Sequence, residues 1–144
     1  MGSEMCIRDS LKETILPAKA EGKMVLCDRF HDSTVAYQGY GRGLNLKNIE
    51  SIITHSIKPY TPDLTFLLTI SPKTVVDRLD QRKEESAKDR LDIESSKFFE
   101  RTAKGYKELA SAEPERFVCL DGEQEIEVIH QQIISLLQDR FSIG

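Results

Sequence analysis

Two charged residues side by side, Asp28 and Arg29, carry the first chemical signal in this sequence. They follow a short apolar run at 24–27, Met-Val-Leu-Cys, which predicts a buried strand. Open parallel sheets bind ligands at the carboxyl ends of their strands, so the pair would stand where a ligand docks. An arginine guanidinium there can bind a phosphate through two parallel, charge-assisted hydrogen bonds. An isolated Asp-Arg pair is more often a simple ion pair that caps the next helix.

Polar and aromatic residues beyond this pair shift the interpretation toward a binding site. Ser33 follows Arg29 by one helical turn, and Tyr37 and Gln38 follow Ser33 by another. A hydroxyl, an aromatic ring and an amide would then approach the same pocket as the guanidinium. Asp28 would pair with Arg29, or hold a magnesium-bound water or a substrate hydroxyl.

Strands and helices that must position these residues alternate along the chain. Continuous apolar runs predict strands at 24–28, 64–70 and 116–120, each buried on both faces. Apolar residues at helical spacing predict helices between them, with Gly22 as a stop, Asn45 as an N-cap and Ser71-Pro72 at a helix start. The helical stripes span 11–16, 46–57, 75–79, 98–109 and 126–137. This alternation predicts βαβ units and a parallel sheet, that is, an α/β fold.

Composition narrows the class of protein. A chain of 144 residues with 39% hydrophobic and 31% charged residues is typical of one globular domain. Its net charge of −4 argues against a general nucleic-acid binder, which needs a basic face. Three scattered cysteines without a C-x-x-C pair predict neither a disulfide framework nor a zinc site, and suit a reducing cytoplasm. No apolar run reaches membrane-spanning length.

Several motifs in succession give the sequence a specific resemblance. The stretch from Val25 to Gly43, with Asp28-Arg29-Phe30 and Ala36-Tyr37-Gln38-Gly39, resembles the second signature of the thymidylate kinases. The resemblance continues in order and at family spacing through Pro62-Asp63-Leu64-Thr65, Asp89-Arg90-Leu91-Asp92, Phe98-Phe99-x-Arg101, Gly105-Tyr106-x-x-Leu109-Ala110, Pro114-x-Arg116-Phe117 and Asp121. It covers nearly everything from Leu11 to the last helix. It implies the three-layer P-loop NTPase fold of the nucleoside monophosphate kinases, a parallel sheet with flanking helices.

The resemblance also implies a reaction, the ATP-dependent and Mg²⁺-dependent phosphorylation of dTMP to dTDP in dTTP biosynthesis. Arg29 would bind the phosphate of dTMP, with Asp28 in the same phosphate and magnesium neighbourhood. Around the sugar and base the resemblance places a set of substrate-binding residues: Ser33, Thr34, Tyr37, Gln38 and Tyr106. The charged stretch 82–90 would be the lid, and Arg82 and Arg90 its phosphate-reaching arginines, although composition alone predicts a solvated loop there. The family is cytoplasmic and typically dimeric, which makes a homodimer an expectation.

One part of the family pattern is missing from these residues. The sequence contains no Gly-x-x-x-x-Gly-Lys-Ser/Thr phosphate loop. Residues 1–10 lack helical or strand periodicity and resemble a non-native leader. We therefore expect 11–144 to be roughly the C-terminal two thirds of such a kinase domain, without its first strands and inactive alone. Two alternatives stay open: another nucleoside monophosphate or deoxynucleoside kinase, and a non-catalytic nucleotide-binding relic.

Overall fold

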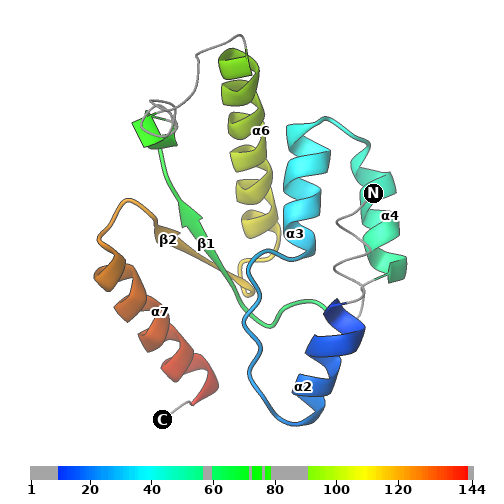
Figure 1. Ribbon diagram of the computed structural model, residues 1–144, viewed down its shortest axis with the longest axis vertical. Coiled ribbons are helices and arrows are strands. Elements are labelled where there is room, and N and C mark those ends of the chain that lie inside the picture. Colours follow the sequence, from blue (N-terminus) through cyan, green and yellow to red (C-terminus); the bar gives the residue numbers. More distant parts are fainter. Residues whose placement is uncertain (1–9, 57–59, 72, 76, 79–90, 143–144) are drawn as a thin grey trace. The chain divides into compact units, whose positions relative to one another are not determined.

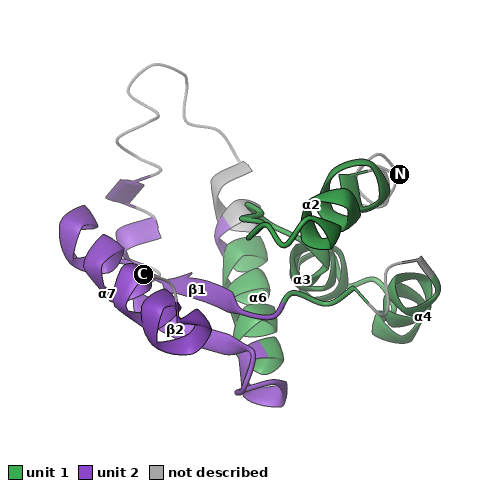
Figure 2. Ribbon diagram, turned by 90° about the horizontal axis from the view of Figure 1, so that it is seen from below, with its two compact units in different colours: residues 1–62, 97–109 green, residues 63–96, 110–144 purple. Residues whose placement is uncertain are grey.

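The computed structural model describes residues 10–56, 60–71, 73–75, 77–78 and 91–142. Figure 1 shows the course of the chain. The chain divides into two compact units, residues 1–62 with 97–109, and residues 63–96 with 110–144 (Figure 2). The first unit contains η1 (Leu11–Ile15), α2 (Leu16–Ala20), α3 (His31–Thr34), η2 (Val35–Gly41) and α4 (Leu46–Ser56). The second contains β1 (Thr65–Thr69), β2 (Phe117–Asp121) and α7 (Ile126–Phe141). The long helix α6 (Leu91–Ala112) supplies its residues 97–109 to the first unit.

A small apolar core holds the first unit together. Leu11, Val35, Ile49 and Ile53 are buried against one another, one or two from each of η1, η2 and α4. Burying a side chain of this size contributes about 1.5–3 kcal/mol. Partly buried hydrophobic residues surround the cluster: Ile15, Leu16, Phe30, Tyr40, Leu46 and Leu109. The stripe at 11–16 therefore faces the core as predicted. So do Leu46, Ile49 and Ile53 of the stripe at 46–57, whereas Ile52 is 53% exposed and residue 57 lies outside the described residues.

Helix signals in the sequence are also confirmed at their ends. Gly22 has a φ of +73°, the left-handed conformation of a residue just past a helix. The backbone N–H of Asn48 donates to Asn45 Oδ1 over 3.3 Å, as an N-cap requires. Ser71 caps the helical residues after β1, because its Oγ accepts the N–H of Thr74 at 3.2 Å.

In the second unit β1 and β2 form a parallel pair. The register runs from Thr65 opposite Phe117 to Thr69 opposite Asp121. Both strands lie within one residue of the runs predicted at 64–70 and 116–120, and their parallel pairing confirms the α/β prediction. Arg116 is only 7% exposed, and its Nη1 donates to Thr65 Oγ1 over 2.9 Å, which fastens the start of β2 to β1.

A carboxylate joins the loops at the other end of this pair. Glu123 Oε1 accepts the backbone N–H of Ser71 at 2.7 Å and the hydroxyl of Thr74 at 2.6 Å. These hydrogen bonds lower the pKa of Glu123 to about 2, and the one from Thr74 has the largest effect. The clamp links the residue that follows β2 to the helical residues that follow β1.

The strand predicted at 24–28 is wrong. These residues form no regular structure, and Met24 and Leu26 are 50% and 82% exposed. A strand is stable only when its backbone groups pair, and the sheet within the described ranges consists of β1 and β2 alone. The apolar composition of residues 24–28 favours a buried strand, but a strand also needs a neighbouring strand to pair with.

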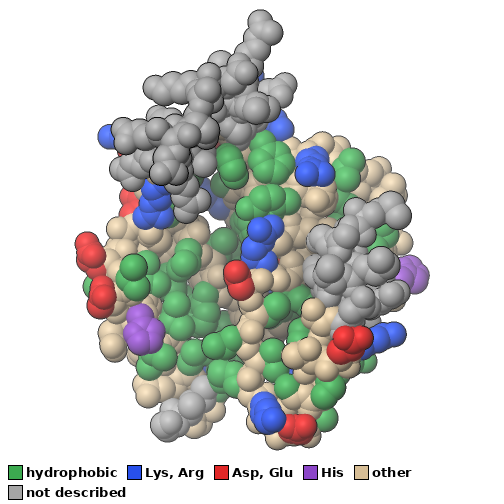
Figure 3. Space-filling view, in the orientation of Figure 1, with side chains coloured by type: hydrophobic (Ala, Val, Ile, Leu, Met, Phe, Trp, Pro, Cys, Tyr) green, Lys and Arg blue, Asp and Glu red, His purple; other side chains and the backbone are tan. Residues whose placement is uncertain are grey.

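Hydrophobic side chains are visible at the surface in Figure 3. Among the helices that the structure describes, none is long and apolar enough to cross a membrane.

The helices η2 and α6 approach so closely that only glycine fits at the contact. A Cβ atom on Gly105 would lie 2.7 Å from two ring carbons of Tyr40, and one on Gly41 would lie 2.6 Å from Thr102 Oγ1. Real Cβ atoms essentially never come within 3.0 Å of such a neighbour. The two glycines therefore set the distance between the helices.

We expect Gly105→Ala to destabilise the chain, although alanine is the better helix former by about 1 kcal/mol. The new methyl group would press against Tyr40, and overpacking of this kind costs about 1–3 kcal/mol. The measurement is the urea concentration at half-unfolding. In a Tyr40→Ala background the same substitution should become neutral or stabilising, because the ring is gone. The exposed Ala103→Gly, the reverse change in the same helix, is the control for helix propensity. Equal costs of Gly105→Ala with and without the ring would contradict the contact.

Candidate functional site

Arg29 has a backbone conformation that L-amino acids avoid. Its φ is +67°, and Ser142 is the other non-glycine residue with positive φ among the residues described. The left-handed region costs a residue with a Cβ atom about 1–2 kcal/mol. Strain of this kind persists where the surroundings enforce it, often at functional sites.

This backbone brings the Arg29 side chain back over η2. Its guanidinium carbon lies 4.6 Å from the centre of the Tyr37 ring, within the range of a cation–π interaction. Its Nε donates a long hydrogen bond of 3.4 Å to Ser33 Oγ. The two terminal nitrogens of Arg29 donate to no other side chain or carbonyl that the structure describes. As far as the described residues go, the planar end of the guanidinium is therefore open to an anion.

Tyr106 of α6 completes the arrangement. Its hydroxyl lies 2.8 Å from Ser33 Oγ, and its ring meets the Tyr37 ring edge-to-face with centroids 6.3 Å apart. Tyr37 also contacts Phe98 of α6, with centroids 5.8 Å apart. We call Arg29, Ser33, Tyr37 and Tyr106 the Arg29 cluster. Three residues close in sequence and one from α6 thus form one connected polar and aromatic group.

Burial raises the pKa of Tyr106 above its ordinary value of 10.0, and the Ser33 hydrogen bond works in the opposite direction. The neighbouring Tyr37 raises it further and the Arg29 charge lowers it, both as smaller effects. Tyr106 is therefore a neutral phenol at neutral pH. A neutral phenol can donate a hydrogen bond to a ligand oxygen and accept one from Ser33.

The remaining predicted residues lie at different depths. Thr34 is buried, at 6% exposure, and Gln38 is half-buried on η2. Asp28 is exposed and makes no ion pair with Arg29 or another described residue, so the simple ion-pair interpretation is wrong. Burial, and secondarily the Asp28 charge, raise the pKa of the Cys27 thiol. Arg82 and Arg90, with the predicted lid, lie outside the described residues.

Two features next to the cluster had no clear signal in the sequence. His31 and Asp32 are 9% and 5% exposed, with Nδ1 and Oδ1 3.5 Å apart, so His31 is a packing residue. Arg101 of α6 donates from Nε to the carbonyl oxygen of Gly41 over 2.9 Å. Arg101 belongs to the motif Phe98-Phe99-x-Arg101, but a side-chain hydrogen bond to a distant carbonyl leaves no periodic pattern in the sequence.

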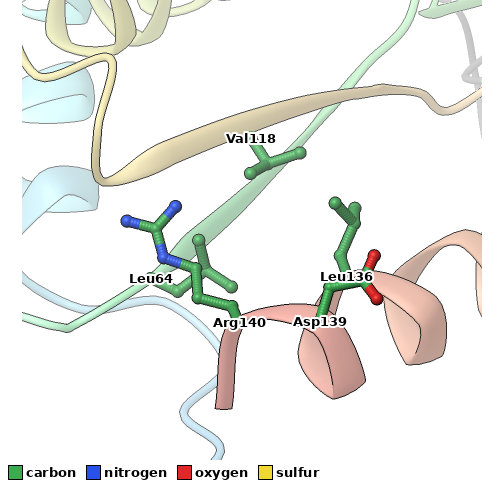
Figure 4. Close-up of a pocket in the computed structure, with 5 residues that line it drawn as sticks. All are labelled: Leu64, Val118, Leu136, Asp139 and Arg140. Atoms are coloured by element: carbon green, nitrogen blue, oxygen red, sulfur yellow. The ribbon is translucent and has the colours of Figure 1, made fainter. Parts of the chain in front are cut away.

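The second unit contains a pocket (Figure 4). It has a volume of about 370 Å³ and lies between the sheet and α7. Its lining residues are Leu64, Val118, Leu136, Asp139 and Arg140. None of them was a predicted site residue.

Arg29→Gly should leave the chain more stable than Arg29→Ala, by about 1 kcal/mol, because glycine adopts positive φ without steric cost. Both variants lose the same cation–π contact, so urea unfolding compares backbone strain alone. The control is the neighbour Asp28, whose φ is not positive. There glycine should be the less stable of the two. A more stable Arg29→Ala would show that the left-handed conformation is not enforced.

Ser33→Ala should raise the pKa of Tyr106 still further, because the hydroxyl stabilises the phenolate. A raised pKa in the folded state means that Tyr106 contributes stability fully below its unfolded pKa near 10, and that this is lost as pH rises through the folded pKa. NMR of ¹³Cζ-labelled tyrosine measures the titration, and Tyr106→Phe assigns the signal. A lowered pKa in Ser33→Ala would show that Tyr106 is the donor in this bond.

Comparison with known proteins gives the same family as the motifs between Val25 and Asp121. A family model described as thymidylate kinase matches residues 6–133. The thymidylate kinase of Kosmotoga olearia is 40% identical over 124 residues, covering 86% of this chain and 58% of that protein. The one from Desulfovibrio desulfuricans is 42% identical over 130 residues, covering 88% and 60%.

A solved structure gives the same result at the level of the fold. The crystal structure of thymidylate kinase from Ehrlichia chaffeensis superposes with a TM-score of 0.70 at 29% identity, covering 94% of this chain and 60% of that one. The chain thus spans about 60% of the length of these relatives. With most of its residues matched in order, the chain belongs to the thymidylate kinase family.

Proposed function

We propose that this chain provides the acceptor-nucleotide half of a dTMP kinase, which transfers the γ-phosphoryl group of ATP to dTMP and forms dTDP. The observation that carries the proposal is the Arg29 cluster, a guanidinium with free terminal nitrogens beside two tyrosines and a serine hydroxyl. The family and its relatives named thymidylate kinase supply the nucleotide.

Each member of the cluster has a task in this proposal. The two terminal nitrogens of Arg29 bind the phosphate of dTMP, and the Tyr37 ring holds the guanidinium in place through the cation–π contact. Tyr106 lies near the base, and Ser33 fixes its hydroxyl. Thr34 and Gln38 belong to the sugar pocket, although Thr34 lies deeper than a direct contact requires and acts by packing. Asp28, exposed and without an ion-pair partner among the described residues, faces the phosphate and magnesium neighbourhood.

The donor side of the reaction rests on the family alone. ATP and Mg²⁺ are the family's co-substrate and metal, and Arg82 and Arg90 are proposed to reach the transferring phosphoryl group. The described residues gather no group of three His, Cys, Asp or Glu that could hold a metal. A Mg²⁺ ion bound mainly by nucleotide phosphates needs no such group. A cytoplasmic location and a homodimer belong to the same proposal.

A second candidate is a module that binds nucleotide without turning it over. The observation that favours it is the absence of a phosphate-loop motif from the 144 residues. Another acceptor nucleotide is the third candidate. Both keep a phosphate on Arg29, and they differ in turnover and in the preferred base.

We expect the 144-residue chain to bind dTMP, and Arg29→Ala to weaken this binding tenfold or more. Each charge-assisted hydrogen bond contributes about 1.5–3 kcal/mol, and 1.4 kcal/mol is tenfold. Calorimetric titration measures the affinity. Arg42→Ala removes the same charge from an exposed residue nearby and is the control. Equal losses in the two variants would reduce Arg29 to general charge attraction. Titration with AMP, CMP and GMP tests the other acceptors, and tighter binding of one of them would replace dTMP.

The same chain should give no dTDP above background in a coupled assay with ATP and Mg²⁺. Phosphoryl transfer depends almost wholly on positioning and charge stabilisation, and this sequence has no backbone cradle for the β- and γ-phosphates. Measurable turnover would place the donor site within these residues and contradict the assignment of the chain to the acceptor half.

A further inference from the structure

A side chain of α6 holds the end of η2. Arg101 Nε donates to the carbonyl oxygen of Gly41, the last residue of η2, over 2.9 Å. The last carbonyls of a helix lack partners within the helix and carry partial negative charge. We propose that Arg101 is a positioning residue: its bond to Gly41 holds η2 against α6 and thereby sets the contact between Tyr37 and Tyr106.

Other carbonyls in this helix already have partners. The carbonyl of Tyr37 accepts the N–H of Arg42 at 3.0 Å, and the carbonyl of Gln38 accepts the N–H of Leu44 at 3.1 Å. The nearest hydroxyl, on Thr102, donates to the Phe98 carbonyl of its own helix at 2.8 Å. Arg101 is thus the side chain in the described part of the chain that bonds this end of η2 to α6.

Sequence spacing places the Arg101–Gly41 bond close to the contact between Tyr37 and Tyr106. Tyr37 precedes Gly41 by four residues, and Tyr106 follows Arg101 by five. At about 1.5 Å per helical residue, the bond lies only about one to two turns from the aromatic contact. Gly41 and Gly105 themselves present no Cβ atom at this contact, so neither contributes a side chain that could hold the two helices in register. A directional bond at the helix end supplies what the small residues cannot.

Arg101 differs from Arg29 in what it does. Its Nε is engaged with a backbone carbonyl, so it acts on the Arg29 cluster through Tyr37 and Tyr106. The meaning of this cluster for dTMP rests on the proposed function, whereas the effect on the two tyrosines does not. Tyr106 reports the effect, since its pKa is raised mainly by burial in this contact. Looser helices would hydrate the phenol and return its pKa toward the ordinary value.

The test uses the 144-residue chain with ¹³Cζ-labelled tyrosine and three variants. Arg101→Met keeps a long apolar stem and loses the donors. Arg101→Lys keeps a charge but replaces the rigid planar donor by a flexible one. Arg42→Met removes the same charge at the same helix end, from an exposed residue with no described side-chain partner.

The proposal predicts a lower Tyr106 pKa than in the unmodified chain for Arg101→Met, a smaller decrease for Arg101→Lys, and none for Arg42→Met. Affinity for dTMP should fall about fivefold in Arg101→Met, the equivalent of one ordinary hydrogen bond. An unchanged Tyr106 titration in Arg101→Met, or an equal change in Arg42→Met, would overturn the proposal. Should Arg101→Met fail to fold, as judged by circular dichroism, Arg101→Lys decides in the same way: a decrease supports the proposal and an unchanged titration overturns it.

The titration needs no nucleotide, so it separates the two claims. If dTMP binds neither the unmodified chain nor the variants, the proposed function fails while the Tyr106 pKa still judges Arg101. If dTMP binds but neither its affinity nor Tyr106 responds to Arg101→Met, the positioning role fails and the acceptor site stands.

Discussion

The close contact between η2 and α6 is the constraint on which the candidate site depends. Tyr37 lies on one helix and Tyr106 on the other, and Ser33 at the end of α3 reaches Tyr106 only because the helices nearly touch. Gly41 and Gly105 permit this distance, since a methyl group at either position would collide with Thr102 or with Tyr40. Val35 of η2 also belongs to a core of aliphatic residues, which Tyr40 of η2 and Leu109 of α6 pack against. Packing therefore comes first here, and the geometry of the polar groups follows from it.

Arg29 shows how such a site is prepared for an anion. Its left-handed backbone costs about 1–2 kcal/mol, whereas an exposed cation–π contact returns about 0.5–1 kcal/mol. The long bond to Ser33 adds little, so the free chain does not fully offset the strain. Binding an anion through two charge-assisted bonds would more than offset it. Such a site is preorganised: the free-energy cost of holding Arg29 in its binding conformation is met on folding, so that less ordering remains when the anion binds.

Much of this organisation could be read from the sequence. Most of the helical segments, the caps at Asn45 and Ser71, the stop at Gly22 and the two strands of the parallel pair could be predicted because each depends on a local pattern. The grouping of Arg29, Ser33 and Tyr37 came from their spacing. Tyr106 came from the family resemblance, because no spacing connects a residue on α6 with one on α3.

The errors have an equally physical origin. Residues 24–28 have the composition of a buried strand, but pairing depends on a neighbour that no local pattern supplies. Tertiary contacts set the π-helical form of η2 and the left-handed backbone conformation of Arg29. Arginine is seldom found at positive φ, so the sequence offers no reason to expect that conformation. The Arg101 bond and the Glu123 clamp each join groups some fifty or sixty residues apart. Such contacts are visible only once the fold is known.

Arg29, whose terminal nitrogens have no partner among the described residues, is proposed to receive the phosphate of a nucleotide. ¹⁵N NMR tests this assignment by following the Arg29 Nε resonance during titration with dTMP and, separately, with thymidine, which lacks only the phosphate. We expect dTMP to shift this resonance and thymidine at the same concentration to leave it unchanged. An equal shift with both ligands, or none with dTMP while other resonances respond, would contradict the assignment of the phosphate to Arg29.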